Sequence, residues 1–205
     1  MSEKFTVVAT IKDGIAIGSK NIGPILVNVL LYVITIWIPY LNVGTTIGLM
    51  AGIVTKASRG EVIPVTEIFD PKYRRYMGEY FLTSGLIGLG VGAGLLFGVI
   101  PGIVIGLAWS LAILLVVDKG KNPTEAITMS NNCTYGHKKK IFGIYFLLSL
   151  ILSVIVSILG SIAYAVNDAG LSFMISLFII LIGIFTLFVS IGLQASIYKQ
   201  LTENI

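Results

Sequence analysis

Long apolar runs, free of charge except at their ends, constrain this chain more than any other property of its sequence. A helix needs about 20 mostly apolar residues to cross the hydrocarbon core of a bilayer. Six runs approach or exceed that length: Ile22–Tyr40, Asn42–Ala57, Tyr80–Ile100, Gly102–Val117, Ile141–Val166 and Leu171–Ile197. Charged residues make up only 12% of the chain, against roughly 25% in soluble proteins. We therefore predict an all-α polytopic membrane protein with six transmembrane helices. The same composition excludes a soluble enzyme, a disordered chain and a protein that binds nucleic acid.

The basic residues all fall on one side of the membrane if each of the six runs crosses it. They are Lys4, Lys12, Lys20, Lys56, Arg59, Lys72, Arg74, Arg75, Lys119, Lys121, Lys138, Lys139, Lys140 and Lys199. The opposite side then carries Asp168 as its sole charge, in the turn Asn167–Gly170. Because Lys and Arg close to a span stay in the cytoplasm, both termini are predicted to be cytoplasmic.

The six runs group into three tight hairpins within one integral membrane domain, residues 1–205. The predicted parts are an interfacial helix (1–21), hairpin 1 (22–57), a cytoplasmic link (58–79), hairpin 2 (80–117), a second link (118–140) and hairpin 3 (141–198). In the first part Val8, Ile11 and Ile15 share one helical face, which is typical of a helix lying in the membrane interface. The units recur every sixty residues or so, and both a threefold repeat and a chance arrangement remain open.

A short series of motifs runs through the middle of the chain. It consists of Pro101-Gly102, then Asp118 and Gly120, then Pro123, Glu125, Ala126 and Ser130. This order, over residues 44–150, resembles a prokaryotic family of six-helix membrane proteins of unassigned function, which includes the membrane domain attached to some glycerophosphodiester phosphodiesterases. The resemblance implies a module of the prokaryotic cytoplasmic (inner) membrane that works near lipids or with partners. It does not imply phosphodiesterase activity, which belongs to a separate soluble barrel.

Groups that could carry out catalysis are scarce. His137 is the single histidine and lies beside three lysines, as expected for a solvated interfacial residue. Cys133 is the single cysteine, which excludes an intramolecular disulfide. The carboxylates of Glu61, Glu67 and Asp70 alternate with basic residues and are predicted to form a solvated, mutually paired surface. We expect a non-enzymatic protein without a metal or another cofactor.

The spans contain no ionisable residue away from their ends. This argues against proton-coupled carriers and voltage sensors, which place such groups inside the membrane. The second and fourth runs are short and rich in glycine, and they occupy equivalent places in their hairpins. In transporters, paired short or glycine-interrupted helices of this kind often mark the substrate site. Close helix packing is the alternative explanation for the glycines. Gly98, Gly102 and Trp109 are the candidates for a solute path here.

Hydroxyl groups form a stripe along the fifth run. Ser149, Ser153, Ser157 and Ser161 repeat every four residues, which places them on one slowly drifting helical face. The sixth run adds further polar residues, among them Gln194. The stripe could line a hydrated path, or its hydroxyls could hydrogen-bond back to their own helix.

Two basic clusters precede the third and fifth runs. They are Arg74-Arg75 and Lys138-Lys139-Lys140. Anionic lipids attract such clusters by about 1 kcal/mol per charge, so these residues are candidates for binding lipid headgroups, although they also serve as topology signals.

The sequence as a whole favours a channel or passive solute pathway. Six short helices leave little room for a pore within one chain, so we expect a homo-oligomer in contact with the lipid bilayer, including anionic lipids. The alternative is a membrane scaffold or accessory subunit that binds lipids or another membrane protein through its cytoplasmic helices.

Overall fold

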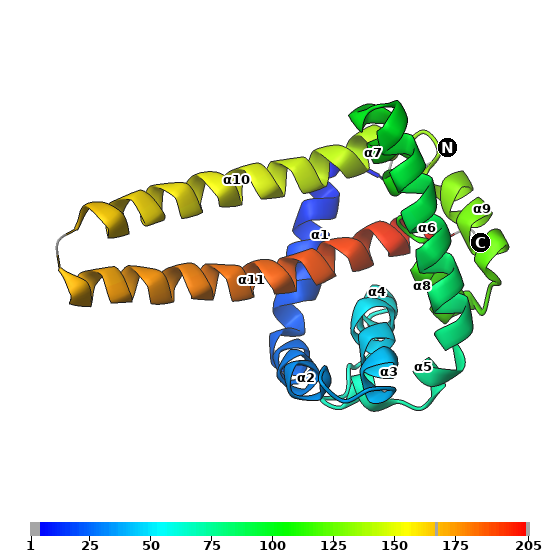
Figure 1. The fold of residues 1–205 in the computed structure, drawn as a ribbon, viewed down its shortest axis with the longest axis horizontal. Coiled ribbons are helices and arrows are strands. Elements are labelled where there is room, and N and C mark those ends of the chain that lie inside the picture. The colour runs from blue at the N-terminus through cyan, green and yellow to red at the C-terminus, as the bar shows by residue number, and fades with distance from the viewer. Residues whose placement is uncertain (1–4, 167, 204–205) are drawn as a thin grey trace.

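The computed structural model describes residues 5–166 and 168–203, and these residues fold entirely into helices and connecting turns (Figure 1). Residues 1–4 of the predicted first segment, Asn167 of the predicted outer turn and residues 204–205 lie outside the described part. The longer helices are α1 (Val7–Lys20), α2 (Ile22–Thr35), α6 (Met77–Phe97), α7 (Val99–Ala108), α8 (Ala112–Lys119), α9 (Pro123–Thr134), α10 (Lys138–Ala165) and α11 (Ala169–Thr202). The predicted all-α class is confirmed.

Helix α1 crosses α11 through glycines on both helices. Thr6 caps α1 by accepting a hydrogen bond from the Ala9 amide at 3.3 Å. Thr10, Gly14 and Gly18, one helical turn apart, form its buried face. A Cβ atom on Gly192 of α11 would overlap the carbonyl oxygen of Gly14, so the two backbones touch directly. The predicted helix is therefore present, but its small residues make the contact with the rest of the protein.

The second apolar run forms one helical stretch with an irregular centre. It consists of α3 (Leu41–Ile47), the π-helical turn η1 (Gly48–Gly52) and α4 (Ile53–Ser58). The following link, which contains η2 (Glu67–Phe69) and α5 (Lys72–Arg75), folds back against the glycines of η1. Asn28 of α2 holds this link by donating to the Pro64 carbonyl at 2.8 Å and accepting from the Ile68 amide at 3.1 Å.

The link corrects one sequence-based prediction. Glu67 is not part of a solvated surface, because it is only 3% exposed. Its carboxylate pairs with Lys56 at 2.6 Å and with Lys72 at 3.3 Å. The Asp70 carboxylate accepts from the Lys72 amide at 3.0 Å, while Pro71 occupies the cap position of α5.

The second hairpin turns earlier than predicted. Gly98, at φ +140°, separates α6 from α7, and Pro101 and Gly102 lie inside the first turns of α7. Glycine adopts this backbone conformation readily, whereas proline is tolerated in a first helical turn because the amide there needs no helical partner. A Cβ on Gly94 would come within 2.9 Å of the Gly102 backbone, so this hairpin also closes on glycines.

The helix following this turn is broken between α7 and α8, and α9 bridges the break. Ser130 donates to the Ala108 carbonyl at 2.8 Å and accepts from the Leu111 amide at 3.1 Å. Thr134 donates to the same carbonyl at 3.2 Å. Asn122 caps α9 by accepting from the Glu125 amide at 2.9 Å. The polar side chains of α9 therefore satisfy backbone groups that the break leaves open.

This role of Ser130 can be tested by Ser130→Ala. The change leaves the buried Leu111 amide without its side-chain acceptor, and the Ala108 carbonyl keeps only Thr134 as a side-chain donor. We therefore expect the free energy of unfolding to fall by about 1–3 kcal/mol. Thr128→Ala is the matched control, because the Thr128 hydroxyl is exposed and bonds only within α9 at 2.9 Å. Thermal unfolding in detergent should separate the two variants, and equal stability would contradict the bridging role.

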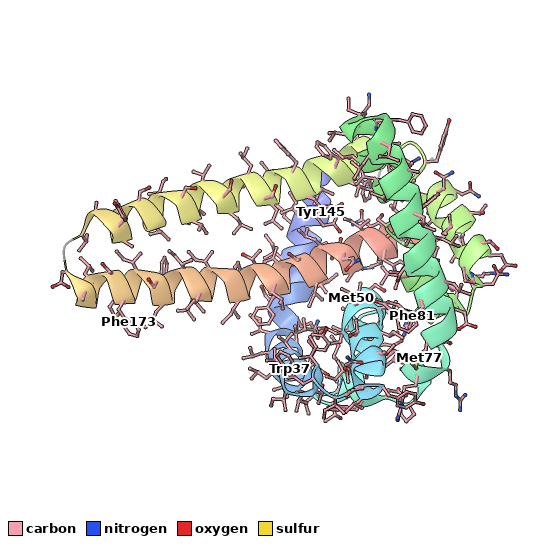
Figure 2. All side chains as sticks on the ribbon, in the orientation of Figure 1. Trp37, Met50, Met77, Phe81, Tyr145 and Phe173 are labelled. Atoms are coloured by element: carbon pink, nitrogen blue, oxygen red, sulfur yellow. The ribbon has the colours of Figure 1, made fainter. Side chains whose placement is uncertain are left out.

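Helices α10 and α11 form a long hairpin that projects from the body of the protein (Figure 1). Apolar side chains project from it on all sides, for example Tyr145 and Phe173 (Figure 2), and Phe173 is 63% exposed. Helices α1 and α6 lie across the axis of this hairpin (Figure 1).

Four helical segments in the described residues are long and apolar enough to cross a membrane. They are α6, α7 with α8 (Val99–Lys119), α10 and α11. A fifth results if α1 and α2, bent by 71° against each other, count as one broken span. The protein is thus an integral membrane helical protein in contact with the bilayer, while the six-span count, the domain boundaries and the orientation remain predictions.

Candidate functional site

A cavity of about 240 Å³ lies between the two irregular helical stretches. Met50 of η1 lines one part of it, and Ser110, in the break between α7 and α8, lines another. Ile113 and Leu114 of α8 and Gln194 of α11 complete the lining. The two short, glycine-rich runs singled out in the sequence therefore meet at one partly open space, since Met50 in its lining is 55% exposed.

The irregularities that shape this cavity have local causes. On the η1 side, the Tyr73 ring occupies the place where Gly52 lacks a Cβ, and the Ile68 backbone lies 2.8 Å from where a Cβ of Gly48 would be. On the α7 side, the Trp109 ring fills the corresponding space over Gly90 of α6. In each case a bulky group packs where only glycine leaves room, so the glycines position the cavity walls rather than line it.

The lining combines apolar side chains with two neutral polar groups. The Ser110 hydroxyl donates to the Leu107 carbonyl at 2.9 Å, and Gln194 contributes an amide that can both donate and accept. Among the described residues, no ionisable side chain lines the cavity. Its volume corresponds to about eight water molecules at roughly 30 Å³ each. Such a space suits water or a small neutral solute.

An ion cluster around the buried Glu67 carboxylate fixes the link against η1. Glu67 accepts hydrogen bonds from Lys56, Lys72 and the Tyr73 hydroxyl. Burial and the adjacent Glu67 carboxylate raise the pKa of Tyr73 far above its ordinary value, so Tyr73 remains a hydrogen-bond donor at neutral pH. The cluster thereby holds Tyr73 in contact with Gly52 and stabilises the π-helical turn.

A second polar contact ties together α4, α8 and α11. Asp118 at the end of α8 pairs with Arg59, which ends α4. Its other carboxylate oxygen accepts from the Tyr198 hydroxyl of α11 at 2.7 Å. The Asp118 side chain is 6% exposed. The role of Asp118 is thus to hold these helix ends in register.

The predicted serine stripe faces outwards within one chain. Ser149, Ser153, Ser157 and Ser161 are all exposed. Three of the four hydroxyls donate to carbonyls of α10 itself, at 2.8–2.9 Å. The stripe therefore encloses nothing in a single protomer, and its role in a solute path remains a prediction that requires a second copy.

The other predicted path residues lie around the second hairpin. Trp109 ends α7 next to Ser110 of the cavity. Gly98 forms the turn, and Gly102 is buried against Leu95. The structure therefore brings Trp109 close to the cavity, while Gly98 and Gly102 serve to pack the hairpin.

The basic candidates are in different surroundings. The aliphatic part of Arg74 packs over Gly44, and Arg75 is exposed. Lys138 donates to the Asn131 side chain at 3.0 Å, and Lys140 donates to the Phe5 carbonyl at 2.8 Å. Lys139 is exposed. Lys140 thus has a structural partner in the chain, which the sequence could not indicate.

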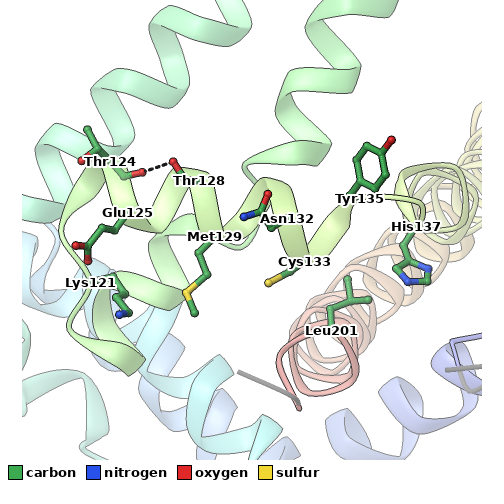
Figure 3. A pocket seen from close by; sticks show the side chains of 10 residues that line it. All are labelled: Lys121, Thr124, Glu125, Thr128, Met129, Asn132, Cys133, Tyr135, His137 and Leu201. Atoms are coloured by element: carbon green, nitrogen blue, oxygen red, sulfur yellow. Dashed lines mark hydrogen bonds between the residues drawn. The ribbon is translucent and has the colours of Figure 1, made fainter. Parts of the chain in front are cut away.

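A wider groove of about 770 Å³ runs along α9 towards the end of α11 (Figure 3). It is lined by Lys121, Thr124, Glu125, Thr128, Met129, Asn132, Cys133, Tyr135, His137 and Leu201. Burial, together with the nearby Lys140 charge, lowers the pKa of His137, so the imidazole is neutral at pH 7. Among the described residues no three His, Cys, Asp or Glu side chains form a metal-binding group.

The remaining motif residues shape this part of the chain. Gly120 has φ +61° and ends α8 in the left-handed conformation. Pro123 occupies the first turn of α9, and Ala126 is fully buried against the core. Comparison with protein-family models, curated proteins and solved structures found no match, so the resemblance to the six-helix family remains a prediction.

Proposed function

We propose that this protein is a passive membrane pathway for small neutral solutes and that the cavity at Met50, Ser110 and Gln194 is its selective point. The observation that carries the proposal is that two separately interrupted helices border one cavity. Irregular backbone at membrane depth is tolerated where it is buried in protein or lines a cavity, and paired interruptions are typical of solute sites in transporters.

The chemistry of the lining supports a neutral solute and a passive mechanism. The buried carboxylates of Glu67 and Asp118 are held in ion pairs, and neither is among the lining residues. Coupling to protons or ions normally requires such groups in the path. No catalytic group is part of this mechanism, so the proposal is of a non-enzymatic protein.

The proposed assembly is a homo-oligomer in the cytoplasmic membrane of a prokaryote, with both termini inside. The exposed apolar flanks of α10 and α11 leave room for a second copy beside the serine stripe. Membership of the six-helix family is part of the same proposal. It rests on the motif residues, of which Asp118, Gly120 and Ser130 have structural roles here.

Flux through purified protein in liposomes tests this function. We expect uptake of glycerol or urea above that of empty vesicles, measured by stopped-flow light scattering. Gln194→Leu removes the amide at similar volume and should reduce this flux about five- to thirtyfold, since a lost hydrogen bond to a bound solute costs roughly 1–2 kcal/mol. Thr186→Val is the control on the same helix, because the Thr186 hydroxyl bonds only to Ile182 within α11. Equal flux in vesicles with and without protein would reject the proposal.

The groove along α9 favours a second candidate, a scaffold that binds another membrane protein. Met129 and Tyr135 in its lining are of the residue types enriched in protein-binding surfaces, and Lys121 and Glu125 suit the polar rim of such a surface. A photoreactive residue at Thr128 should then cross-link to a different membrane protein in native membranes. Cross-links between copies of this chain alone would favour the homo-oligomeric pathway.

A further inference from the structure

A second surface cavity lies between α7 and the beginning of α10. Its volume is about 280 Å³. Ile103, Val104 and Leu107 of α7 form one wall, and Phe142 of α10 lies across from them. In Figure 1 this is the place where α7 lies over the body end of the projecting hairpin. The groove is thus next to the point where α10 leaves the body of the protein.

The apolar side of this groove is open to the surroundings. Ile103 is 39% exposed, Val104 is 43% exposed and Phe142 is 42% exposed. Both α10 and the α7–α8 segment are candidate membrane spans. In a bilayer, exposed apolar side chains on such helices would meet hydrocarbon rather than water. A lipid chain is the occupant that such a position supplies.

The other end of the groove carries positive charge. Lys138 and Lys139 line it, and both belong to the first turn of α10. The Lys138 ammonium group donates to the Asn131 side chain at 3.0 Å, and Lys139 is exposed. Among the described residues, no carboxylate lines the groove. The N-terminus of a 28-residue helix adds a partial positive charge at the same place.

The order of these groups matches the two parts of a phospholipid. Phe142 follows Lys138 by four residues, about one helical turn or 6 Å along α10. A phosphate held by the lysines therefore continues directly into a chain lying on Phe142 and α7. Charged surface with an apolar groove beneath it is the complement of an anionic lipid rather than of a neutral one.

We propose that this groove binds one anionic glycerophospholipid, with its phosphate at Lys138 and Lys139 and an acyl chain against Ile103, Val104 and Phe142. This site is separate from the solute cavity, and it stands whether or not the protein conducts solutes. Its occupant ties α7 to α10 and thus joins the second and third hairpins.

Native mass spectrometry of the full chain in detergent micelles tests the site. The micelles contain phosphatidylglycerol and phosphatidylcholine with identical acyl chains. We expect one phosphatidylglycerol to be retained at least about tenfold more strongly than phosphatidylcholine, given about 1 kcal/mol for each of two lysines. The double variant K138Q/K139Q should lose this preference. Val104→Trp, which fills the groove, should reduce retention of both lipids.

The matched control is K12Q/K20Q, which removes the same charge from two exposed positions outside the groove. It should retain phosphatidylglycerol as the unaltered protein does. Equal retention of the two lipids by the unaltered protein would overturn the proposal, and so would an equal loss in the control. A lipid-free dimer that Val104→Trp dissociates would also overturn it, in favour of a second copy as occupant. Should V104W not fold, Ile103→Trp provides the same test.

Discussion

Replacing Gly192 by leucine is expected to remove most of the folded protein. A Cβ there would overlap the carbonyl oxygen of Gly14 and lie 2.7 Å from the amide nitrogen of Gly18. Those are backbone atoms, which cannot turn aside as a side chain can. Overpacking of side chains alone costs about 1–3 kcal/mol, so we expect a loss above about 3 kcal/mol. The measurement is the yield of monodisperse protein after detergent extraction, together with its thermal unfolding midpoint.

Gly183→Leu is the matched control for this prediction. Gly183 lies on the same helix, and among the described residues no atom outside its own helix backbone lies within 4 Å of its Cβ position. A leucine there simply adds to a lipid-facing surface. We expect wild-type yield and stability from this variant. If G192L were as stable as G183L, the close crossing of α1 and α11 would be refuted.

Glu67→Ala should have the second large effect. The change leaves the ammonium group of Lys56 and the hydroxyl of Tyr73 without their buried partner. Tyr73 is buried and the Lys56 side chain is only 18% exposed, and leaving such groups without a partner costs about 1–3 kcal/mol. The link that covers η1 should then detach, which trypsin would detect by faster cleavage after Lys72 and Arg75 than in the unaltered protein.

Glu61→Ala provides the comparison for Glu67→Ala. Like Glu67, Glu61 pairs with a basic residue, in this case Arg59 at 2.5 Å, but the Glu61 side chain is 46% exposed. Exposed ion pairs contribute about 0–1 kcal/mol, so this variant should unfold and be cleaved almost as the unaltered protein is. Similar behaviour of the two variants would mean that the Glu67 cluster does not hold the link.

Local patterns in the sequence were sufficient for much of the helical structure. The apolar runs predict α6, α10 and α11 because a helix is the structure that satisfies its own backbone in lipid. Asn122 and Pro123 predict the start of α9 because capping and first-turn proline are local effects. The position of the turn in the second hairpin was predicted less accurately, because Gly98 rather than Pro101 supplies the backbone conformation that the turn requires.

Contacts between distant segments could not be predicted in this way. Glu67 is buried because Asn28, some forty residues earlier, holds the link against α2. The pairing of Gly14 and Gly18 with Gly192 joins opposite ends of the chain. The four-residue spacing of the two α1 glycines was visible in the sequence, but it does not identify which helix packs against them.

For the candidate cavity, too, local sequence patterns predict one part and long-range contacts determine the rest. The short, glycine-rich second and fourth runs predict irregular helices, and both η1 and the break at Ser110 are irregular. Met50 and Gln194 could not be assigned to one site, because that depends on how η1, α8 and α11 are rotated against one another. That rotation is fixed by long-range contacts such as those of Asp118.

Accessibility of the cavity from the two sides of the membrane tests the proposed pathway most directly. Cys133 is the single cysteine, so Ser110→Cys in a Cys133→Ser background places one thiol in the cavity. Ile144→Cys serves as the buried control, because Ile144 is fully buried. In sealed vesicles, we expect a small membrane-impermeant thiol reagent to label position 110 from either side and position 144 from neither. Labelling of position 110 from one side only, or from neither, would contradict a continuous pathway through this cavity.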